Sequence, residues 1–284
     1  MEGGKKSSPP LAFNFPPSSF ARLVAMTAPQ VIDRLAQRNR PAGSVAGYQT
    51  WSDLLFVHWR VPAAELRPLL PAEVEIDECD GSAWVGLVLF HMTGVRPWWF
   101  PAIPGVSEFH ETNVRTYVTC NGEPGVWFFS LDAANSLAVR VARWRWRLRY
   151  FFAEMSIARR DSLIEYRSQR LWPEPIPANA DVASEIGDWL PGGGPHGEAA
   201  PGTLEFFLAE RYLLFTELSP GRIARGQVHH TPYPLKTAKL LRCDQSLVSA
   251  SGINVTNPPA HVLFSPGVTV DIFPLKALLA RRSR

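Results

Sequence analysis

The chain has 284 residues, of which 46% are hydrophobic, so it is long enough to bury one large core or two small ones. Charged residues make up 19% and the formal net charge is +3, values that argue against a disordered chain and against a coiled coil. The sequence contains no window of about 18 unbroken apolar residues, which excludes a membrane-spanning helix.

The N-terminal segment differs in composition from the rest of the chain. Residues 1–19 are rich in proline and serine, and we expect them to be disordered. Residues 20–40 carry apolar side chains at roughly helical spacing, which predicts a helix with a break or turn at Pro29. The apolar run 23–26 is too short for a signal peptide. Residues 1–47 are therefore predicted to form a tail and a helix outside the core.

The pattern then changes to strands. Short alternating or apolar runs predict strands over 51–61, 74–77, 83–95, 113–120, 126–131, 150–157, 163–168, 212–218, 222–230 and 268–273. The turn Asp80-Gly81 predicts a hairpin between the second and third of these runs, and Asn121-Gly122 predicts one between the fourth and fifth.

Helical signals in this part of the chain are few. They predict short helices over 62–70 and 203–210, and residues 172–202, with many prolines and glycines, predict a long irregular loop. The fold class expected is α+β, mainly antiparallel β, with the sheet curled into a barrel or sandwich. We place the domain at 48–276 and a basic C-terminal tail at 277–284.

One stretch places four polar side chains on one face of a predicted strand. Within Phe109–Tyr117, Glu111, Asn113, Arg115 and Tyr117 alternate and would point the same way. One interpretation is an exposed sheet face with a Glu111–Arg115 ion pair. The other is a polar-lined barrel interior, in which Arg115 binds a carboxylate and Glu111 moves a proton.

Arginines and aromatic residues interleave between Arg140 and Tyr150. Strict alternation over 143–150 is typical of a strand, whereas 135–144 fits a helix about as well, with one apolar stripe formed by Leu137, Val141 and Trp144. Such a segment can bind nucleic acid, or its tryptophans can pack in the core with the arginines in water. Because the net charge is only +3 and no nucleic-acid motif occurs, we expect no nucleic-acid partner.

Two further groups of polar residues are structural by default. His229 and His230 are adjacent, so they point to opposite faces of a strand, and no His spacing typical of a metal site occurs; we expect no metal. Glu210-Arg211-Tyr212 reads as an ion pair at a helix–strand junction, with a supporting role at a site as the alternative. The three cysteines lie far apart, which indicates reduced thiols and a cytoplasmic location.

Several long motifs, taken in order, resemble the YqjF-like family of unknown function, a branch of the acetoacetate decarboxylase-like superfamily. The resemblance covers roughly residues 48–275. The motifs are Trp51-Ser52-Asp53-Leu54-Leu55-Phe56-Val57-His58-Trp59, Gly81-x-x-Trp84-Val85-Gly86, Glu111 to Val118, Gly125 to Ala133, Glu210-Arg211-Tyr212 and His229-His230-x-Pro232-x-Pro234-Leu235.

The resemblance implies a cone-shaped, mainly antiparallel β-barrel with a few helices and a closed internal pocket. It also implies that Glu111 matches the pocket glutamate of the decarboxylases, and that Tyr150 and Phe151 replace their lysine pair. No lysine lies between Ser7 and Leu235. Without an amine no imine forms, so the decarboxylase electron sink is absent.

These observations predict a small-molecule pocket protein, favoured as an enzyme that acts on a carbonyl- or carboxylate-bearing metabolite without covalent catalysis, of lyase, isomerase, cyclase or hydratase type. The alternative is a non-catalytic sensor or carrier. Glu111, Tyr150 and His230 are the candidate catalytic residues, and the candidate substrate-binding residues are Arg115, Asn113, Tyr117 and His58. We expect no cofactor and no membrane partner, and the sequence leaves a homo-oligomer open.

Overall fold

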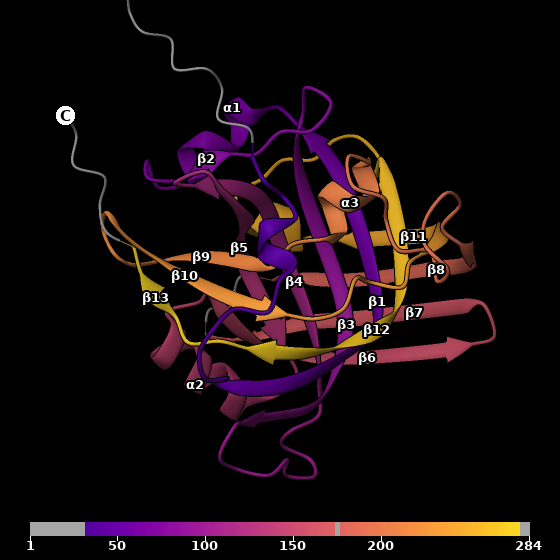
Figure 1. Ribbon diagram of the computed structural model, residues 1–284. Coiled ribbons are helices and arrows are strands. Elements are labelled where there is room, and N and C mark those ends of the chain that lie inside the picture. Colours follow the sequence, from indigo (N-terminus) through magenta and orange to yellow (C-terminus); the bar gives the residue numbers. More distant parts are fainter. Residues whose placement is uncertain (1–31, 174–176, 279–284) are drawn as a thin grey trace, which may run out of the picture. The chain divides into compact units, whose positions relative to one another are not determined.

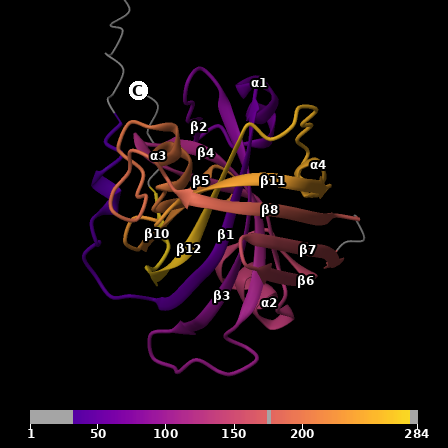
Figure 2. The same ribbon diagram turned by 90° about the vertical axis from the view of Figure 1, so that its right-hand side faces the viewer.

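The computed structural model describes residues 32–173 and 177–278 (Figures 1 and 2). Within these residues, thirteen strands form a single sheet in which most neighbouring strands are antiparallel. The strands are β1 Gly47–Val61, β2 Glu75–Ile76, β3 Ala83–Pro97, β4 Phe109–Cys120, β5 Glu123–Ala133, β6 Tyr150–Arg160, β7 Leu163–Trp172, β8 Asn179–Trp189, β9 Leu213–Ser219, β10 Arg222–His229, β11 Lys236–Gln245, β12 His261–Ile272 and β13 Lys276–Ala277.

Helices are few and short. They are the 3-10 helices η1 Ala36–Arg38 and η2 Arg67–Leu69, and the α-helices α1 Ala63–Leu66, α2 Ser136–Trp146, α3 Leu204–Ala209 and α4 Leu247–Ala250. The prediction of a mainly antiparallel β fold with few helices is therefore confirmed. No helix in the described part of the chain is long and apolar enough to cross a membrane.

The strands close into a barrel-like ring. The order runs β5-β6-β7-β8-β11-β12-β1-β3-β4, and the additional pairing of β4 with β5 returns the sheet to its start. A second pairing, β10 with β12, together with that of β9 with β5, closes a second ring that shares β12, β1, β3, β4 and β5 with the first. Alternating side chains of the ring strands fill two large hydrophobic clusters, one around Leu55 and Val57 and one around Leu54 and Phe56.

Adjacent residues of β1 thus contribute to different clusters, as the two-residue period of a strand requires. Strand β4 lies between β3 and β5, and all its residues but one are buried. Because both of its edges are paired, its inward side chains are fixed in direction. This strand carries the candidate site residues Glu111 to Tyr117.

Two sequence predictions about the strands are wrong in part. The Asp80-Gly81 turn forms, with Cys79 and Ser82 exchanging backbone hydrogen bonds of 3.0 and 3.2 Å, but segment 74–77 does not pair with β3; instead β2 pairs with β4, with Glu75 opposite Thr119. The supposed loop 172–202 contains strand β8, which pairs with β7 and β11. Most of the prolines and glycines that suggested a loop lie before or after β8, whereas Ala180, Val182 and Ile186 alternate inward within it.

The arginine-rich segment is helical where strict alternation favoured a strand. Helix α2 runs to Trp146, and Arg147, with φ +55°, ends it in the left-handed conformation. The chain then turns into β6 at Tyr150. Helix formation is supported by Asn135, whose side-chain oxygen accepts from the backbone N–H of Ala138, as an N-cap does.

The helix predicted over 20–40 lies partly outside the described residues. In the described portion only Ala36–Arg38 is helical, as a 3-10 turn. The flanking arginines instead pair with the sheet: Arg34 donates two hydrogen bonds of 2.6 Å to the Asp77 carboxylate, and Arg40 pairs with Asp271. These contacts hold residues 32–46 against the strands.

Candidate functional site

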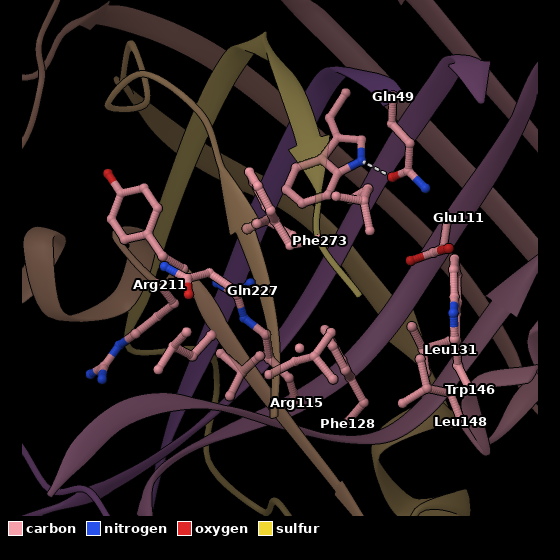
Figure 3. A pocket seen from close by; sticks show the side chains of 18 of the residues that line it. Gln49, Glu111, Arg115, Phe128, Leu131, Trp146, Leu148, Arg211, Gln227 and Phe273 are labelled. Carbon is pink, nitrogen blue, oxygen red and sulfur yellow. Dashed lines mark hydrogen bonds between the residues drawn. The ribbon is translucent and has the colours of Figure 1, made fainter. Parts of the chain in front are cut away.

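A cavity of about 120 Å³ lies on the face of β3 and β4 that carries Phe90 and Glu111, and β9, β10 and the end of β12 cover it (Figure 3). This volume is several times the roughly 10–15 Å³ that a cavity needs to admit one water, so the cavity has room for a small molecule. Its wall is predominantly apolar and aromatic, with side chains from the sheet and from the end of α2, among them Phe90, Phe128, Leu131, Trp146 and Phe273. The polar side chains on this wall are few, and their arrangement decides what the cavity can bind.

Glu111 and Arg115 reach the cavity from the same face of β4. They are four residues apart, so the two-residue period of the strand puts both on one side. The register of β4 with β5 shifts between Val114 and Arg115, which marks a bulge on the β5 side beside the arginine. The polar-interior interpretation of this strand is the one that the structure supports.

Glu111 is 4% exposed and accepts a hydrogen bond of 2.9 Å from the Tyr150 hydroxyl to Oε2. Tyr150 is the first residue of β6 and lies beside Leu131 of β5, from where its ring reaches toward β4. The sequence therefore predicted a pair of residues that the structure brings together on the wall of one cavity.

Burial raises the pKa of Glu111 to about 7, although hydrogen bonds from Tyr150 and Asn113 lower it and the Asp132 charge raises it further. Arg115 is not among the causes. The sequence left two directions open, raised if Glu111 is buried away from Arg115 and lowered if paired to it, and the first applies. Burial raises the pKa of the Tyr150 hydroxyl well above its usual value, and the neighbouring Glu111 carboxylate raises it further.

Arg115 is anchored on one side only. Its Nη2 donates to the Leu208 carbonyl at 2.9 Å and to the Tyr117 hydroxyl at 3.3 Å, whereas its buried Nε has no partner among the described residues. An unpartnered guanidinium N–H on a cavity wall is a donor ready for an anionic or carbonyl oxygen. Figure 3 shows Arg115 beside Phe128 in this wall.

Tyr117 and His58 lie behind Arg115 and do not line the cavity. The Tyr117 hydroxyl donates to the Leu208 carbonyl at 2.8 Å and lies 2.7 Å from Nε2 of His58. Burial lowers the pKa of His58 well below its usual value, so the ring is neutral. Because the Tyr117 hydroxyl donates to Leu208, it accepts from His58 in the tautomer that carries the proton on Nε2. These two side chains hold Arg115 in place, a supporting role in contrast to the direct ligand contact expected from the sequence.

Asn113 and His230 also lie off the cavity wall. Asn113 is buried and contributes to the site by lowering the Glu111 pKa. His230 stacks on Tyr212 with 4.6 Å between ring centroids, and Tyr233, equally close, separates it from the cavity. Burial lowers the His230 pKa to about 4, so the ring is neutral near pH 7 and supports the aromatic wall.

Sequence reasoning missed two amides on the cavity wall, Gln49 and Gln227. The Gln49 Oε1 accepts from Nε1 of Trp51 at 2.8 Å, a contact visible in Figure 3. The signal in the sequence was the spacing of Gln49 and Trp51, which are two residues apart at the start of β1. This spacing places the amide on the same, inward face as the tryptophan. Gln227 reaches the same wall from a position near the end of β10.

Arg211 lines the cavity with its stem, while its guanidinium points away from the other labelled side chains (Figure 3). Its Nη1 pairs with Asp77 at 2.8 Å and its Nε donates to the Phe207 carbonyl at 2.7 Å. The default prediction for Glu210-Arg211-Tyr212 was an ion pair within this segment, but Arg211 forms its ion pair with Asp77. Glu210 accepts from the Tyr212 hydroxyl and, at 2.9 Å, from the backbone N–H of Tyr233.

Among the described residues, no lysine lines the cavity. Lys236 lies with its ammonium 4.7 Å from the Trp189 ring, away from Glu111, and Lys239 follows on the same strand. Within the same residues no three His, Cys, Asp or Glu side chains are grouped as a metal site requires. The polar groups on this wall are thus one carboxyl, two amides, three phenols and two guanidinium groups, of which Tyr212 is engaged with Glu210 and Arg211 with Asp77.

The family can now be stated from comparison with known proteins. The DUF2071 family, described as an uncharacterized conserved protein, matches residues 48–269. The chain belongs to this family. It is also 34% identical over 246 residues to the uncharacterized protein YqjF of Bacillus subtilis, a match that covers 86% of this chain and 98% of that protein.

Solved structures in the acetoacetate decarboxylase-like superfamily share the fold. Acetoacetate decarboxylase from Legionella pneumophila matches with a TM-score of 0.56 and 13% identity, over 87% of this chain and 96% of that chain. An acetoacetate decarboxylase-like enzyme from Sphingomonas wittichii matches with a TM-score of 0.55 and 12% identity, over 84% and 94%. The enduracididine biosynthesis enzyme MppR, complexed with pyruvate, matches with 0.52 and 11%, over 85% and 94%. At this identity the likeness concerns the fold.

Proposed function

We propose that this protein is an acid–base enzyme that acts on a small carbonyl- or carboxylate-bearing metabolite without forming an imine. Fold neighbours that are enzymes make catalysis a reasonable expectation for the fold. The observation that carries the proposal is the Glu111–Tyr150 hydrogen bond of 2.9 Å on the wall of an apolar cavity, with the Glu111 pKa at about 7. A cytoplasmic location belongs to the same proposal.

Glu111 would move the proton. Near neutral pH a carboxyl with this pKa is divided between its two forms, so it can take a proton from a carbon or hydroxyl and return it within one cycle. A carboxyl with the ordinary pKa would be fully ionised at that pH and would be a weaker base. The dry wall that raises the pKa also keeps water from competing for the proton.

Tyr150 would orient Glu111 and contact the substrate. In the free protein its hydroxyl donates to the ionised carboxylate. Once Glu111 is protonated that acceptor is weakened, and the hydroxyl can donate to a developing oxyanion on a carbonyl. Because Tyr150 stands where the decarboxylase resemblance places an amine, the site exchanges covalent electron withdrawal for hydrogen bonding and proton transfer.

Arg115 would bind the anionic end of the substrate. Its buried Nε faces no protein acceptor, and the Leu208 carbonyl and Tyr117 hydroxyl fix the other side of the guanidinium. A guanidinium held in this way loses little side-chain entropy when it binds a carboxylate. A small substrate with one carboxylate and one carbonyl fits the volume and the polar groups.

The experiment combines a thermal-shift screen with product analysis. Purified full-length protein is incubated with a panel of oxo acids, hydroxy acids and unsaturated acids, and each ligand that raises the melting temperature is checked for conversion by mass spectrometry. Glu111→Gln keeps the side-chain volume and the acceptor for Tyr150 but cannot transfer a proton. We expect this variant to retain the thermal shift while turnover falls by about 10² to 10⁴.

Arg115→Gln is expected to abolish the thermal shift itself. The matched control is Arg160→Gln, an exposed arginine at the end of β6, which should leave both measurements unchanged. The site assignment is wrong if Glu111→Gln and Arg115→Gln both behave as the wild type. Borohydride treatment with ligand present should give no covalent adduct, since the described cavity wall offers no amine.

The second candidate is a non-catalytic sensor or carrier on the same cavity. The unpartnered Arg115 Nε favours ligand binding whether or not chemistry follows. A ligand that gives an Arg115-dependent thermal shift but is recovered unchanged, with no effect of Glu111→Gln on any measured rate, would support this candidate over catalysis.

A further inference from the structure

Helix α2 exposes its apolar stripe. Leu137, Val141 and Trp144 lie on one face and are 57%, 51% and 77% exposed, while Val139 and Ala142 on the opposite face are buried. Large apolar side chains aligned on the outer face of a helix are unusual, because burial of such a stripe is what normally holds a surface helix to its core. The helix therefore has an apolar face available for a partner.

A neighbouring loop adds to this surface. Between β3 and β4 the chain exposes Trp98, Trp99 and Phe100. The far end of the loop is tied to α2, since Asn135 Nδ2 donates to the Val106 carbonyl at 2.8 Å. In Figures 1 and 2 the loop and α2 both lie toward the lower end of the ring, so two apolar elements share one end.

The charge around these elements is predominantly positive. Arg140, Arg147 and Arg149 are exposed on and after α2. Arg140 lies 5.7 Å from the ring of the exposed Trp172 at the end of β7. The sequence contains no acidic residue over 97–107 or over 133–153, and Glu108, the exposed last residue of the loop, lies 3.1 Å from Nε2 of His91. Exposed tryptophan, aliphatic side chains and arginine thus occur together with few carboxylates to neutralise the arginines.

Three occupants could cover such a surface, and their chemistry differs. A second copy of this chain would bring the same arginines against themselves around a two-fold axis, which costs energy. Nucleic acid would pair with the arginines and stack on tryptophans, but Leu137 and Val141 offer it nothing. An anionic lipid surface suits each of the three kinds of side chain. Arginines meet lipid phosphates, tryptophans occupy the headgroup region, and aliphatic side chains enter the acyl boundary.

We propose that α2 and the loop 97–107 form a docking surface for anionic membranes. The eleven-residue α2 is about 16 Å long, half the thickness of a hydrocarbon core, so it would lie in the interface plane. This agrees with the finding that no described helix could cross a membrane. The proposal replaces the expectation of no membrane partner and does not depend on what the cavity does.

The test measures sedimentation of the full-length protein with vesicles. Vesicles of phosphatidylcholine alone are compared with vesicles of phosphatidylcholine and phosphatidylglycerol at low and at raised salt. We expect binding to the anionic vesicles, weakened by salt, and little binding to the neutral ones. Each arginine near the surface adds about 1 kcal/mol, so Arg147→Gln with Arg149→Gln should lower the partition coefficient about thirtyfold.

Two further variants make the result specific. Trp144→Ser leaves every charge in place and is expected to lose binding to the anionic vesicles while its melting temperature is unchanged, because the side chain is exposed. The matched charge control, Arg160→Gln with Arg222→Gln, removes two exposed arginines from other strands and should bind as the wild type.

The proposal is overturned by any of three results. In the first, the wild type fails to bind either kind of vesicle at low salt, and Trp144→Ser dissociates a dimer in sedimentation velocity, which assigns the surface to a second copy. In the second, the control pair weakens binding as much as Arg147→Gln with Arg149→Gln does, which assigns the binding to net charge. Retention on single-stranded DNA that competes with vesicles and survives Trp144→Ser would assign it to nucleic acid.

Discussion

Strand β4 and helix α2 invert the usual distribution of side chains in opposite ways. β4 turns Glu111, Asn113 and Arg115 into the interior, whereas α2, fewer than thirty residues later, turns Val141 and Trp144 outward. Polar groups inside and large apolar groups outside both cost free energy of folding. Their coexistence in one segment indicates that each exception serves binding, one to a small molecule and the other to a surface.

The interior itself holds two kinds of buried charge. Asp132 of β5 accepts from Nε and Nη2 of Arg170 at 2.7 and 2.8 Å, and the Arg170 guanidinium lies 3.7 Å from the Phe151 ring centroid. Glu111, across the sheet from this pair, has a phenol as its partner and no cation. A carboxylate paired this closely is structural, while one left without a cation keeps a pKa suited to proton transfer.

The largest expected effect separates these two charges. Arg170→Met leaves the Asp132 carboxylate buried without its cation, which should lower the free energy of unfolding by about 3 to 5 kcal/mol in chemical denaturation. Arg167→Met on the same strand is the control, because Arg167 is exposed and lies 3.7 Å from Asp181; its loss should stay within about 0.5 kcal/mol. Similar losses in both variants would contradict a structural role for the buried pair.

The next effect tests the other charge through pH. The Glu111 pKa is raised from 4.5 to about 7 on folding, so the native state binds the proton more tightly than the unfolded state does. The stabilisation from this group is complete below pH 4.5 and is lost as pH rises through 7, a change of roughly 3 kcal/mol.

Comparison with Glu111→Gln isolates this contribution from other titrating groups, His230 included. The free energy of unfolding of the variant is subtracted from that of the wild type at each pH. This difference should decrease as the pH rises from 4.5 through about 7. A flat difference curve would mean that Glu111 is not buried as the structure has it.

A smaller effect comes from the partner of Glu111. Tyr150→Phe removes a hydrogen bond that the ionised carboxylate needs more than the neutral carboxyl does. The variant should lose about 2 kcal/mol of stability at pH well above 7 and about 1 kcal/mol at pH well below it. Phe152→Leu on the same strand should give a loss that does not change with pH. Equal losses for Tyr150→Phe at both pH values would exclude the Glu111 contact.

The sequence predicted β4 well because alternation fixes which side chains share a face, and pairing on both edges then leaves little freedom. It predicted Glu111 with Tyr150 only through the family resemblance, since 39 residues separate them and their meeting depends on β5 and β6 pairing in parallel. Whether His58 or His230 reaches the cavity depends on which aromatic ring stands in front, and no periodicity carries that information.

For α2 the sequence left two structures open because arginine and tryptophan suit both a strand and a helix. The deciding feature was local, the Asn135 cap at one end and the left-handed Arg147 at the other. Even with the helix known, the stripe of Leu137, Val141 and Trp144 would be read as core-facing. Its exposure follows from the position of β5 and β6 beneath the other face, which is tertiary information.

The smallest expected effect is therefore the most informative test of the exposed surface of α2. Trp144→Ala should change the free energy of unfolding by no more than about 0.5 kcal/mol, because the ring is exposed and a surface substitution leaves no cavity. Trp84→Ala, in which a fully buried ring is removed, should cost about 3 to 5 kcal/mol in the same denaturation experiment. A large loss from Trp144→Ala would mean that this tryptophan is covered in the folded protein, and the surface of α2 would then belong to the core and not to a membrane.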